Sequence, residues 1–530
     1  MKKPQRIDLN LEQVDALLKR VETGSLQPGD YEIIKAMVET LHLLSQSVDQ
    51  KAASIRRLLR MLFGERSEKL KDVIKNKDES DQASENRPDR NDKPKPKGHG
   101  RNGAVDYTGA QQIKVPHGTL KIGDHCPGCL KGKLYEMKVP KLIVRVTAKA
   151  PLQASVYQMQ KLRCNLCGET FTAKTPEGIG EEKYDAASGA MIALLKYGSG
   201  LPFNRIEQLQ GSLGVPLPAS TQWEIADAMA NKAVAVYDEL IRQAAQGDVL
   251  YNDDTGNKIL SLIKEQNEKA DDSSRKGMFT SAILSTVGGR KIALFFTGRN
   301  HAGENLAHVL AKRKSGLDPP IQMCDALSRN LPKELKTILA NCLVHGRRNF
   351  VDLLASFPEQ CRYVIELLAE VYKNDQVTKD QKLSADERLL YHQTHSKPLM
   401  DELEQWLHVQ FEEKKVEPNS ALGKAISYMQ NHWKPLTLFL KVPNAPLDNN
   451  LCEQVVKRAI LHRKNALFFK TRRGAYVGDL FMSLIHTCSL AKVNPFDYLT
   501  ALQVHASQVR KNPQNWMPWN YDKAAHRTSL

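Results

Sequence analysis

Hydrophobic positions near the start of the chain recur with the periods of a helix. A short amphipathic helix is predicted over residues 11–21, and a longer helix follows residues 28–29. In the longer helix apolar residues recur every seven positions: Ile34, Leu41, Val48, Ile55 and Leu62. This heptad spacing favours a coiled coil, although a helical hairpin packed on itself fits it equally well. We therefore expect a helical or coiled-coil region over residues 1–75.

The next segment has almost no apolar residue. Between residues 76 and 100 only Ala83 is apolar, and lysine, proline and aspartate dominate. Such a composition cannot bury a core and is typical of a disordered linker. We assign the linker to residues 76–112.

Two Cys-x-x-Cys pairs follow the linker. Cys126 with Cys129 and Cys164 with Cys167 present four thiols on two tight turns, which suits a tetrahedral structural zinc site. The alternation of apolar and polar residues at 143–147 and around 156–159 predicts a β-ribbon between the pairs. A redox-active pair is the alternative, but it needs no second copy of the motif. We expect a zinc ribbon, bound to Zn²⁺, within residues 113–178.

Residues 179–246 are predicted to be helical. A helix over 203–213, a turn containing Gly214, and a helix opened by a Thr221–Glu224 capping box outline a helix-turn-helix. Any helical hairpin gives the same outline. The segment is accordingly a candidate DNA-binding region.

The pattern then changes to strands. Four strands are expected, at residues 248–252, 278–285, 291–297 and 321–324. A helix is expected over residues 302–312, between the third and the fourth strand. Asp253 and Asp325 directly follow the first and the fourth of these strands. Carboxylates at strand ends project from a sheet edge and can bind metal, but aspartate is also a routine turn former there.

A third acid, Glu453, opens a helix after a predicted helical insertion at about 331–440. A structural role for Glu453 is the alternative to a metal-binding role, because Asn450 and Glu453 have the spacing of a capping box. However, the tract from Gln454 to Gly478 has no acid and seven basic residues, among them Lys457, Arg458, Arg463 and Lys464. A glutamate beside such a tract suits a site that handles phosphodiesters.

Composition supports a nucleic-acid partner. The chain has 530 residues, with 76 Lys and Arg against 60 Asp and Glu, a net charge of +16. Hydrophobic residues make up 41%, which excludes wholesale disorder, and neither a signal peptide nor an apolar stretch long enough to span a membrane is found. We expect a cytoplasmic protein with no membrane partner. Its cysteines would then bind metal and not form disulfides.

Three carboxylates on one edge would hold two Mg²⁺ or Mn²⁺ ions about 3.5–4 Å apart for metal-assisted phosphoryl transfer. Hard oxygen ligands suit these ions and not zinc, so this site is chemically distinct from the cysteine cluster.

Several segments, in order along nearly the whole chain, resemble transposases of the insertion-sequence-66 family, which are bacterial enzymes of the Asp-Asp-Glu type. Asp253-Asp254-Thr255 is similar to the family's Asp-Glu-Thr, although Asp254 replaces its glutamate. Residues 342–350 resemble its Cys-x-x-His-x-Arg-Arg-x-Phe block. The other matching segments are residues 62–70, the two cysteine pairs, 448–453, 463–465 and 467–468.

The resemblance implies a multidomain α+β protein with an RNase H-like catalytic domain over residues 247–480 and a C-terminal helical region over 481–530. It implies Asp253, Asp325 and Glu453 as the catalytic triad. The residues after Asp325 depart from the family pattern. His345, Arg347 and Arg348 would lie near the site and handle DNA, with a buried structural role as the alternative for His345.

The resemblance further implies action on the terminal inverted repeats of an element and on target DNA, as a homodimer or higher oligomer, with small accessory proteins of the same element. It also implies association with the bacterial nucleoid. Two other functions remain open from the sequence. One is a zinc-containing DNA-binding regulator without catalysis, and the other is a metal-dependent nuclease without strand transfer.

Overall fold

The computed structural model describes residues 11–25, 27–35, 37, 115–116, 119–127, 129, 131–137, 143, 150–163, 165, 170–177, 182–268, 275–333 and 335–528. The chain divides into two compact units, Met1–Asp78 with Ala154–Leu530, and Glu79–Gln153. The predicted heptads beyond residue 37, the predicted linker up to residue 112, and Cys164 and Cys167 lie outside the described residues.

The N-terminal helix is present where the apolar spacing predicts it. Helix α1 spans Leu11–Glu22. Arg20, in the last turn of α1, forms an ion pair with Asp30 at 2.9 Å, and the backbone N–H of Gln27 donates to the same carboxylate. The guanidinium of Arg20 lowers the pKa of Asp30, so the pair ties the turn after α1 to the helix.

Of the predicted β-ribbon, residues 144–147 lie outside the described part of the chain, and the strands that are described lie further along the sequence. Strands β1 (Lys161–Arg163) and β2 (Thr170–Thr172) pair antiparallel, with Leu162 opposite Phe171. Residues 156–159, which were predicted to be a strand, are not one, and Val156 is 88% exposed. Alternation alone does not make a strand, because the segment also needs a hydrogen-bonded neighbour.

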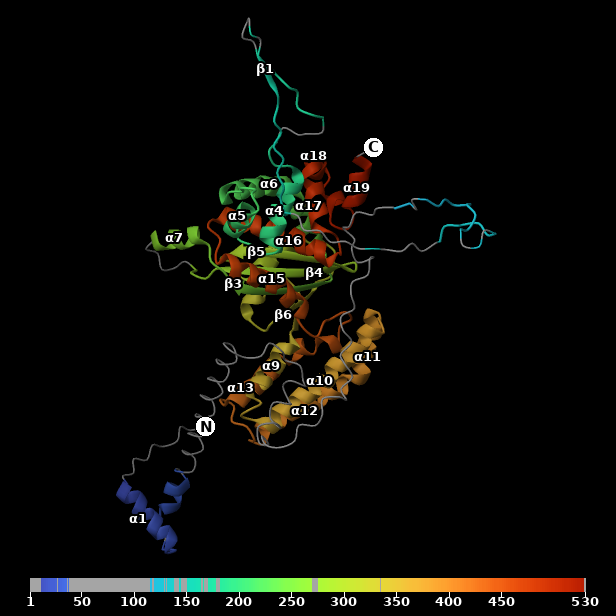
Figure 1. Ribbon diagram of the computed structural model, residues 1–530. Coiled ribbons are helices and arrows are strands. Elements are labelled where there is room, and N and C mark those ends of the chain that lie inside the picture. Colours follow the sequence, from blue (N-terminus) through green and yellow to red (C-terminus); the bar gives the residue numbers. More distant parts are fainter. Residues whose placement is uncertain are drawn as a thin grey trace. The chain divides into compact units, whose positions relative to one another are not determined.

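A five-stranded mixed sheet forms the centre of the well-described part of the chain (Figure 1). Its order is β5-β4-β3-β6-β7, with β3, β4 and β5 antiparallel and with β6 and β7 parallel to β3. The strands are β3 (Val249–Gly256), β4 (Phe279–Val287), β5 (Arg290–Gly298), β6 (Ile321–Cys324) and β7 (Ile338–Asn341). Gly288 and Gly289, both at positive φ, form the tight turn between β4 and β5. Four strands match the predicted positions, whereas β7 was not predicted.

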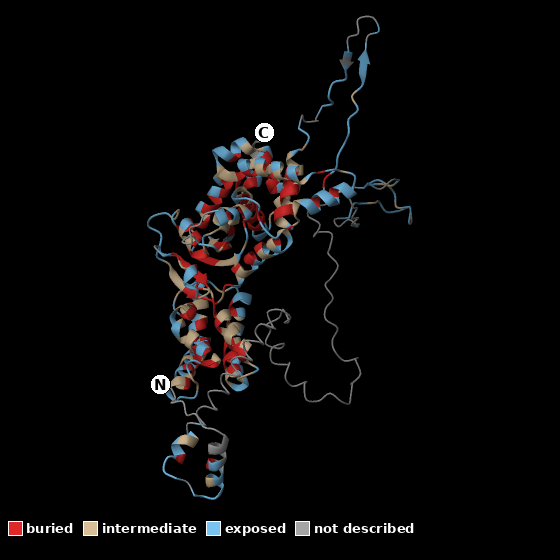
Figure 2. Cartoon of the chain, turned by 90° about the vertical axis from the view of Figure 1, so that its left-hand side faces the viewer, coloured by how far each residue is buried: buried red, intermediate tan, exposed pale blue. Residues whose placement is uncertain are grey.

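Helices pack on this sheet through an apolar core that includes polar anchors. Helix α16 (Arg472–Leu490) lies along β5, and its Ser483 and Thr487 hydroxyls accept the backbone N–H groups of Phe295 and Ala293. Asp479 accepts the N–H and the hydroxyl of Thr297. Figure 2 shows that buried residues run through these helices and strands. Helix α16 crosses residue 480 without a break, so the domain boundary predicted there falls inside a helix.

The predicted helix-turn-helix outline is present as α5 (Phe203–Ser212), a turn with Gly214 at positive φ, and α6 (Ala219–Ala244). The Thr221–Glu224 capping box is wrong, because α6 begins two residues earlier and Pro218 is its N-cap. The buried Gln222 side chain instead closes the turn by donating to the carbonyls of Phe203 and Leu217. Before this pair come α4 (Ala186–Ala193) and the short π-helix Leu194–Gly198.

The predicted insertion begins later than expected, because β7 at residues 338–341 belongs to the sheet. Two helices follow β7 directly, and they are separated where Pro358 starts the second one. The helices after β7 are α9 (Leu343–Leu353), α10 (Pro358–Asp380), α11 (Ala385–His395), α12 (Lys397–Glu412), α13 (Ala421–Asn431) and α14 (Trp433–Leu436).

The other helices are α7 (Leu260–Glu268), α8 (Ala302–Leu310), α15 (Asn450–Ala466), α17 (Pro495–Val504), α18 (Ala506–Lys511) and α19 (Tyr521–Thr528). Short 3₁₀ turns lie at Ser328–Asn330, Leu438–Leu440 and Pro513–Trp516. None of the helices in the described ranges is long and apolar enough to cross a membrane.

Candidate functional site: a carboxylate cluster at the sheet

The first predicted acid lies within the central strand and not after it. Strand β3 runs to Gly256, so Asp253 and Asp254 are consecutive strand residues whose side chains leave opposite faces of the sheet. The backbone N–H of Asp254 donates to Asp253 Oδ1 at 2.8 Å. Burial first, and then the charges of Asp325, Asp254 and Glu453, raise the pKa of Asp253 to about 7, against the lowering effect of that one hydrogen bond.

The second acid, Asp325, follows the neighbouring parallel strand. Tyr251 of β3 is in register with Met323 of β6, so two residues further Asp253 and Asp325 are level on adjacent strands. The side-chain amide of Asn330 donates to the Asp325 carboxylate. Burial raises the pKa of Asp325, while the nearby His345 and this hydrogen bond act in the opposite direction.

The third acid, Glu453, lies in the first turn of α15. The predicted capping box is wrong here: Asn449 is the N-cap, without a side-chain cap bond, and Asn450 bonds to Asp448 instead. Glu453 Oε1 is buried and has no hydrogen-bond partner. Glu453 therefore does not cap the helix, which was its alternative role, and its charge raises the pKa of Asp253.

Glu453 also lies close to two residues of α9. Ligand atoms of Cys342, His345 and Glu453 are all within 4.8 Å of one another, the one such group of three potential metal ligands among the described residues. Asp253, Asp325 and Glu453 do not form a group this tight. The structure thus brings the three predicted acids into electrostatic contact, with Glu453 nearer to the α9 pair.

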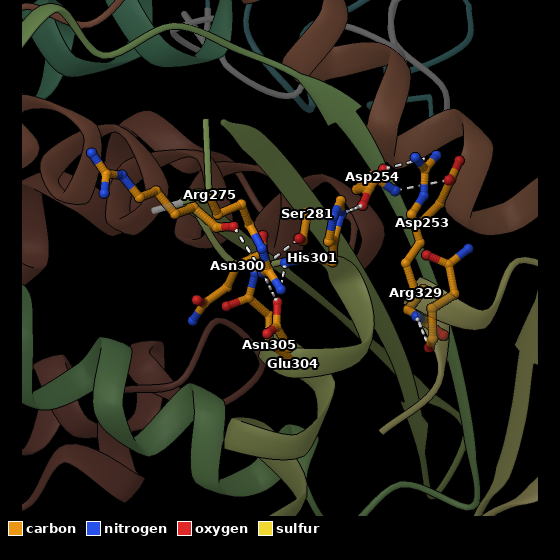
Figure 3. A network of polar contacts seen from close by, with 12 residues as sticks. Asp253, Asp254, Arg275, Ser281, Asn300, His301, Glu304, Asn305 and Arg329 are labelled. Carbon is orange, nitrogen blue, oxygen red and sulfur yellow. Dashed lines mark hydrogen bonds and ion pairs between the residues drawn. The ribbon is translucent and has the colours of Figure 1, made fainter. Parts of the chain in front are cut away.

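Asp254, the neighbour of Asp253, is held by a network of its own (Figure 3). Its side chain is 2% exposed and contacts His301 Nδ1 at 3.0 Å and Arg329 Nη2 at 3.5 Å. The backbone N–H of His301 donates to Glu304, which pairs with Arg275. With its oxygens engaged, Asp254 is suited to fix the strand beside Asp253.

A buried amide network beneath the acids was not predicted. Asn252 Nδ2 donates to the carbonyl of Asn330 at 2.8 Å, and Gln322 Nε2 donates to Asn252 Oδ1 at 2.9 Å and to the same carbonyl at 2.7 Å. Asn449 Nδ2 donates to the carbonyl of Asn252. Polar residues within the otherwise apolar strands β3 and β6 were the sequence signal that could have revealed this network. The network connects Asn252, which precedes Asp253, with Asn330, which donates to Asp325.

The basic residues of α15 divide by their contacts. Arg463 donates to Thr255 Oγ1 at 3.1 Å and to the carbonyl of Gly256, so it binds the end of β3. Lys457, Arg458 and Lys464 are exposed on the same helix. Arg347 and Arg348, predicted to handle DNA, are half-buried on α9. Three of the α15 cations are thus free of the core and face solvent.

One predicted zinc pair lies in the second unit. The N–H of Cys126 donates to the carbonyl of Gly132 at 2.8 Å, and the N–H of Gly132 donates to Cys129 Sγ at 3.4 Å. Backbone N–H groups, that of Gly132 first, lower the pKa of Cys129. A turn that presents a stabilised thiolate fits half of a zinc site.

Comparison with known proteins adds a family relationship. The model of the family described as "Transposase IS66 family" matches residues 183–477, which is more than half of the chain. The uncharacterized protein y4jD of Sinorhizobium fredii (strain NBRC 101917 / NGR234) is 26% identical over 355 residues, 63% of this chain and 66% of that protein. The uncharacterized protein y4hP of the same organism is 24% identical over 362 residues, 64% of this chain and 63% of that protein. The chain thus spans slightly less than two thirds of these relatives.

Proposed function

Since the chain belongs to the IS66 family of transposases, we propose that it binds the ends of a mobile element and cuts and joins DNA strands by metal-assisted phosphoryl transfer. The observation that carries this proposal is the buried carboxylate cluster. Asp253 has a pKa raised to about 7 by burial and by the charges of Asp325 and Glu453. Acids that repel one another in a partly buried site are the arrangement that a bound cation stabilises.

We further propose that the sheet belongs to an RNase H-like catalytic domain. The mixed order β5-β4-β3-β6-β7, with Asp253 on the central strand and Asp325 after its parallel neighbour, supports this assignment. The helices α9 to α14 lie between Asp325 and Glu453 in the sequence, which is the position of an insertion in such a domain.

The donor set fits a hard divalent cation. Asp253, Asp325 and Glu453 offer only oxygen atoms, and Glu453 Oε1 is buried without a hydrogen-bond partner. Mg²⁺ or Mn²⁺ would be held by these three residues. The chemistry that such an ion would supply is activation of a water or hydroxyl for attack and neutralisation of charge on the leaving oxygen.

The protein's own residues would hold this site in one geometry. The N–H of Asp254 and the amide of Asn330 each fix one carboxylate oxygen, so the acids start from a restricted set of orientations. The exposed Lys457, Arg458 and Lys464 would bind backbone phosphates of double-stranded DNA, in a sequence-independent manner. Arg347 and Arg348 on α9 would contact the DNA next to the acids.

Other modules would serve binding and assembly. Cys126 and Cys129, with Cys164 and Cys167, would hold a structural Zn²⁺, and the α5–α6 hairpin would contribute to end recognition. A homodimer or higher oligomer, with small accessory proteins of the same element, would bring two ends together.

The test measures strand cleavage and joining on DNA that carries element ends, with Mg²⁺, Mn²⁺ or a chelator. Glu453→Gln keeps the size of the side chain and removes its charge, so it should abolish cleavage while leaving end binding intact. Glu366→Gln, at an exposed position on α10, is the matched control and should behave as wild type.

The outcome separates this function from its alternatives. A nuclease would give cut but no joined products. A non-catalytic regulator would bind ends and be indifferent to Mg²⁺ and to loss of Glu453. Loss of binding together with cleavage in Glu453→Gln would contradict the assigned role of this residue.

A further inference from the structure

Two helix starts meet beside Glu453. Cys342 is the N-cap of α9 and His345 lies three residues later, so both side chains project from the first turn of that helix. Glu453 lies in the first turn of α15. The N–H of Leu343 donates to the carbonyl of Leu447 at 3.0 Å, and the N–H of Asn449 donates to Cys342 Sγ at 3.3 Å. These two bonds hold the helix starts together, independently of any metal.

The side-chain atoms at this junction lack protein partners. His345 Nδ1 and Glu453 Oε1 are both buried polar atoms without a hydrogen bond. A buried polar atom that stays unpaired costs about 1–3 kcal/mol. Cys342 is fully buried, and its sulfur already accepts a backbone N–H, as thiolate ligands of metals do. His345 and Glu453 each carry an unpaired buried polar atom. Together with the supported sulfur of Cys342, these residues form a group of potential ligands within 4.8 Å of one another, which points to a missing cation.

We propose that Cys342, His345 and Glu453 bind a transition-metal ion of the zinc class, at a position separate from the ion held by Asp253 and Asp325. Sulfur, nitrogen and carboxylate oxygen are the three ligand types that Zn²⁺ accepts, and three protein ligands leave a fourth position open. Around a tetrahedral ion these atoms would be about 3.5 Å apart, so they need to approach by about 1 Å. Rotation about side-chain bonds supplies a movement of this size.

The donor set distinguishes this position from a magnesium site. Mg²⁺ requires oxygen ligands in octahedral geometry and does not bind a thiolate in competition with water, whereas zinc-class ions favour thiolate and imidazole. Glu453 would then stand between two positions, with one oxygen available to each. The inference rests on the contacts of Cys342, His345 and Glu453 and holds whether or not the protein joins DNA strands.

The experiment uses the full chain, reduced, stripped of metal, and titrated with Co²⁺ in excess Mg²⁺. Cobalt reports a thiolate ligand by its sulfur-to-metal charge-transfer band and reports four-coordination by intense visible bands. Cys342→Ala should bind about one Co²⁺ per chain less than wild type and lose part of the charge-transfer band. Cys361→Ala is the matched control, because Cys361 is equally buried, on α10, outside the cluster. The Cys126 pair contributes equally to both variants.

Two further variants make the result decisive. His345→Asn removes a half-buried ligand and should lose the same equivalent of Co²⁺, and it decides the question if Cys342→Ala fails to fold by circular dichroism. Asp253→Asn should keep the full charge-transfer band, because its carboxylate belongs to the other position. Equal cobalt stoichiometry in Cys361→Ala and in both ligand variants would overturn the proposal, as would loss of the band in Asp253→Asn. Failure to join DNA in the cleavage assay would leave the cobalt result unchanged.

Discussion

Replacing Asp253 by asparagine should make the metal-free protein more stable at pH 8. The carboxylate lies beside Asp325 and Glu453, and burial together with these charges raises its pKa from the ordinary 3.8 to about 7. Asparagine has the same shape and keeps an oxygen for the N–H of Asp254, which donates at 2.8 Å. The substitution therefore removes the charge and keeps the contact.

The size of the effect follows from the pKa. In the unfolded chain Asp253 ionises near 3.8, whereas in the folded chain it ionises near 7, so the folded state holds the proton longer. The contribution of Asp253 to stability is therefore most favourable below pH 3.8, and it falls as pH rises from about 4 to about 7. The difference of 3.2 pKa units corresponds to about 4 kcal/mol above pH 7, an upper limit because water reaches part of the carboxylate. Asparagine avoids this loss.

The assay is thermal unfolding at pH 4 and pH 8, each in chelator and in excess Mg²⁺. Asp253→Asn should melt above wild type at pH 8 in chelator, and the two should nearly coincide at pH 4. Mg²⁺ should stabilise wild type more than the variant at pH 8. Asp238→Asn, at an exposed position on α6, should change nothing. A variant that is no more stable than wild type at pH 8, or that gains as much from Mg²⁺, would refute the reasoning.

Three further predictions concern the surrounding structure. Asp479→Ala should destabilise the protein by about 1–3 kcal/mol in chemical unfolding, because the buried N–H of Thr297 loses its acceptor at 2.7 Å; an unchanged midpoint would contradict this. Gly303→Ala should cost about 1–3 kcal/mol, since a Cβ there would lie 2.3 Å from the carbonyl oxygen of Leu331; wild-type stability would show that the backbone gives way. Cys129→Ser should lower the zinc content measured by atomic absorption, and full retention of zinc would remove Cys129 from the predicted site.

The elements that could be predicted are those whose patterns are local. Strands β3 to β6 were found because short apolar runs lie between turn residues, and the helices of the insertion were found from their period. Strand β7 was missed because its four residues, at 338–341, leave too little alternation to recognise. The ribbon was misplaced at 156–159 because the pairing partner of a strand is not encoded in the strand itself.

The same limit applies to the site. Asp253, Asp325 and Glu453 were identifiable as acids at element ends, but their mutual effect on pKa depends on the parallel pairing of β3 with β6. The capping box at Glu453 had the right spacing and did not form, because the helix began at Asn450 after an Asn449 N-cap. The closeness of Cys342 to Glu453 depends on two helix starts, at Leu343 and Asn450, that are 107 residues apart in the chain, and no local pattern reports it.

The buried amides beneath the acids affect how copies of such a gene decay. The side chains of Asn252 and Gln322 bond to each other and to the backbone carbonyl of Asn330, so replacing either one leaves buried polar groups unpaired. Replacing Asn330 instead releases Asp325 from its side-chain donor. Mutational drift can therefore silence a copy whose three acids are all intact. A genome survey that scores copies by the triad alone would count such copies as active, whereas scoring the three amides as well would separate them.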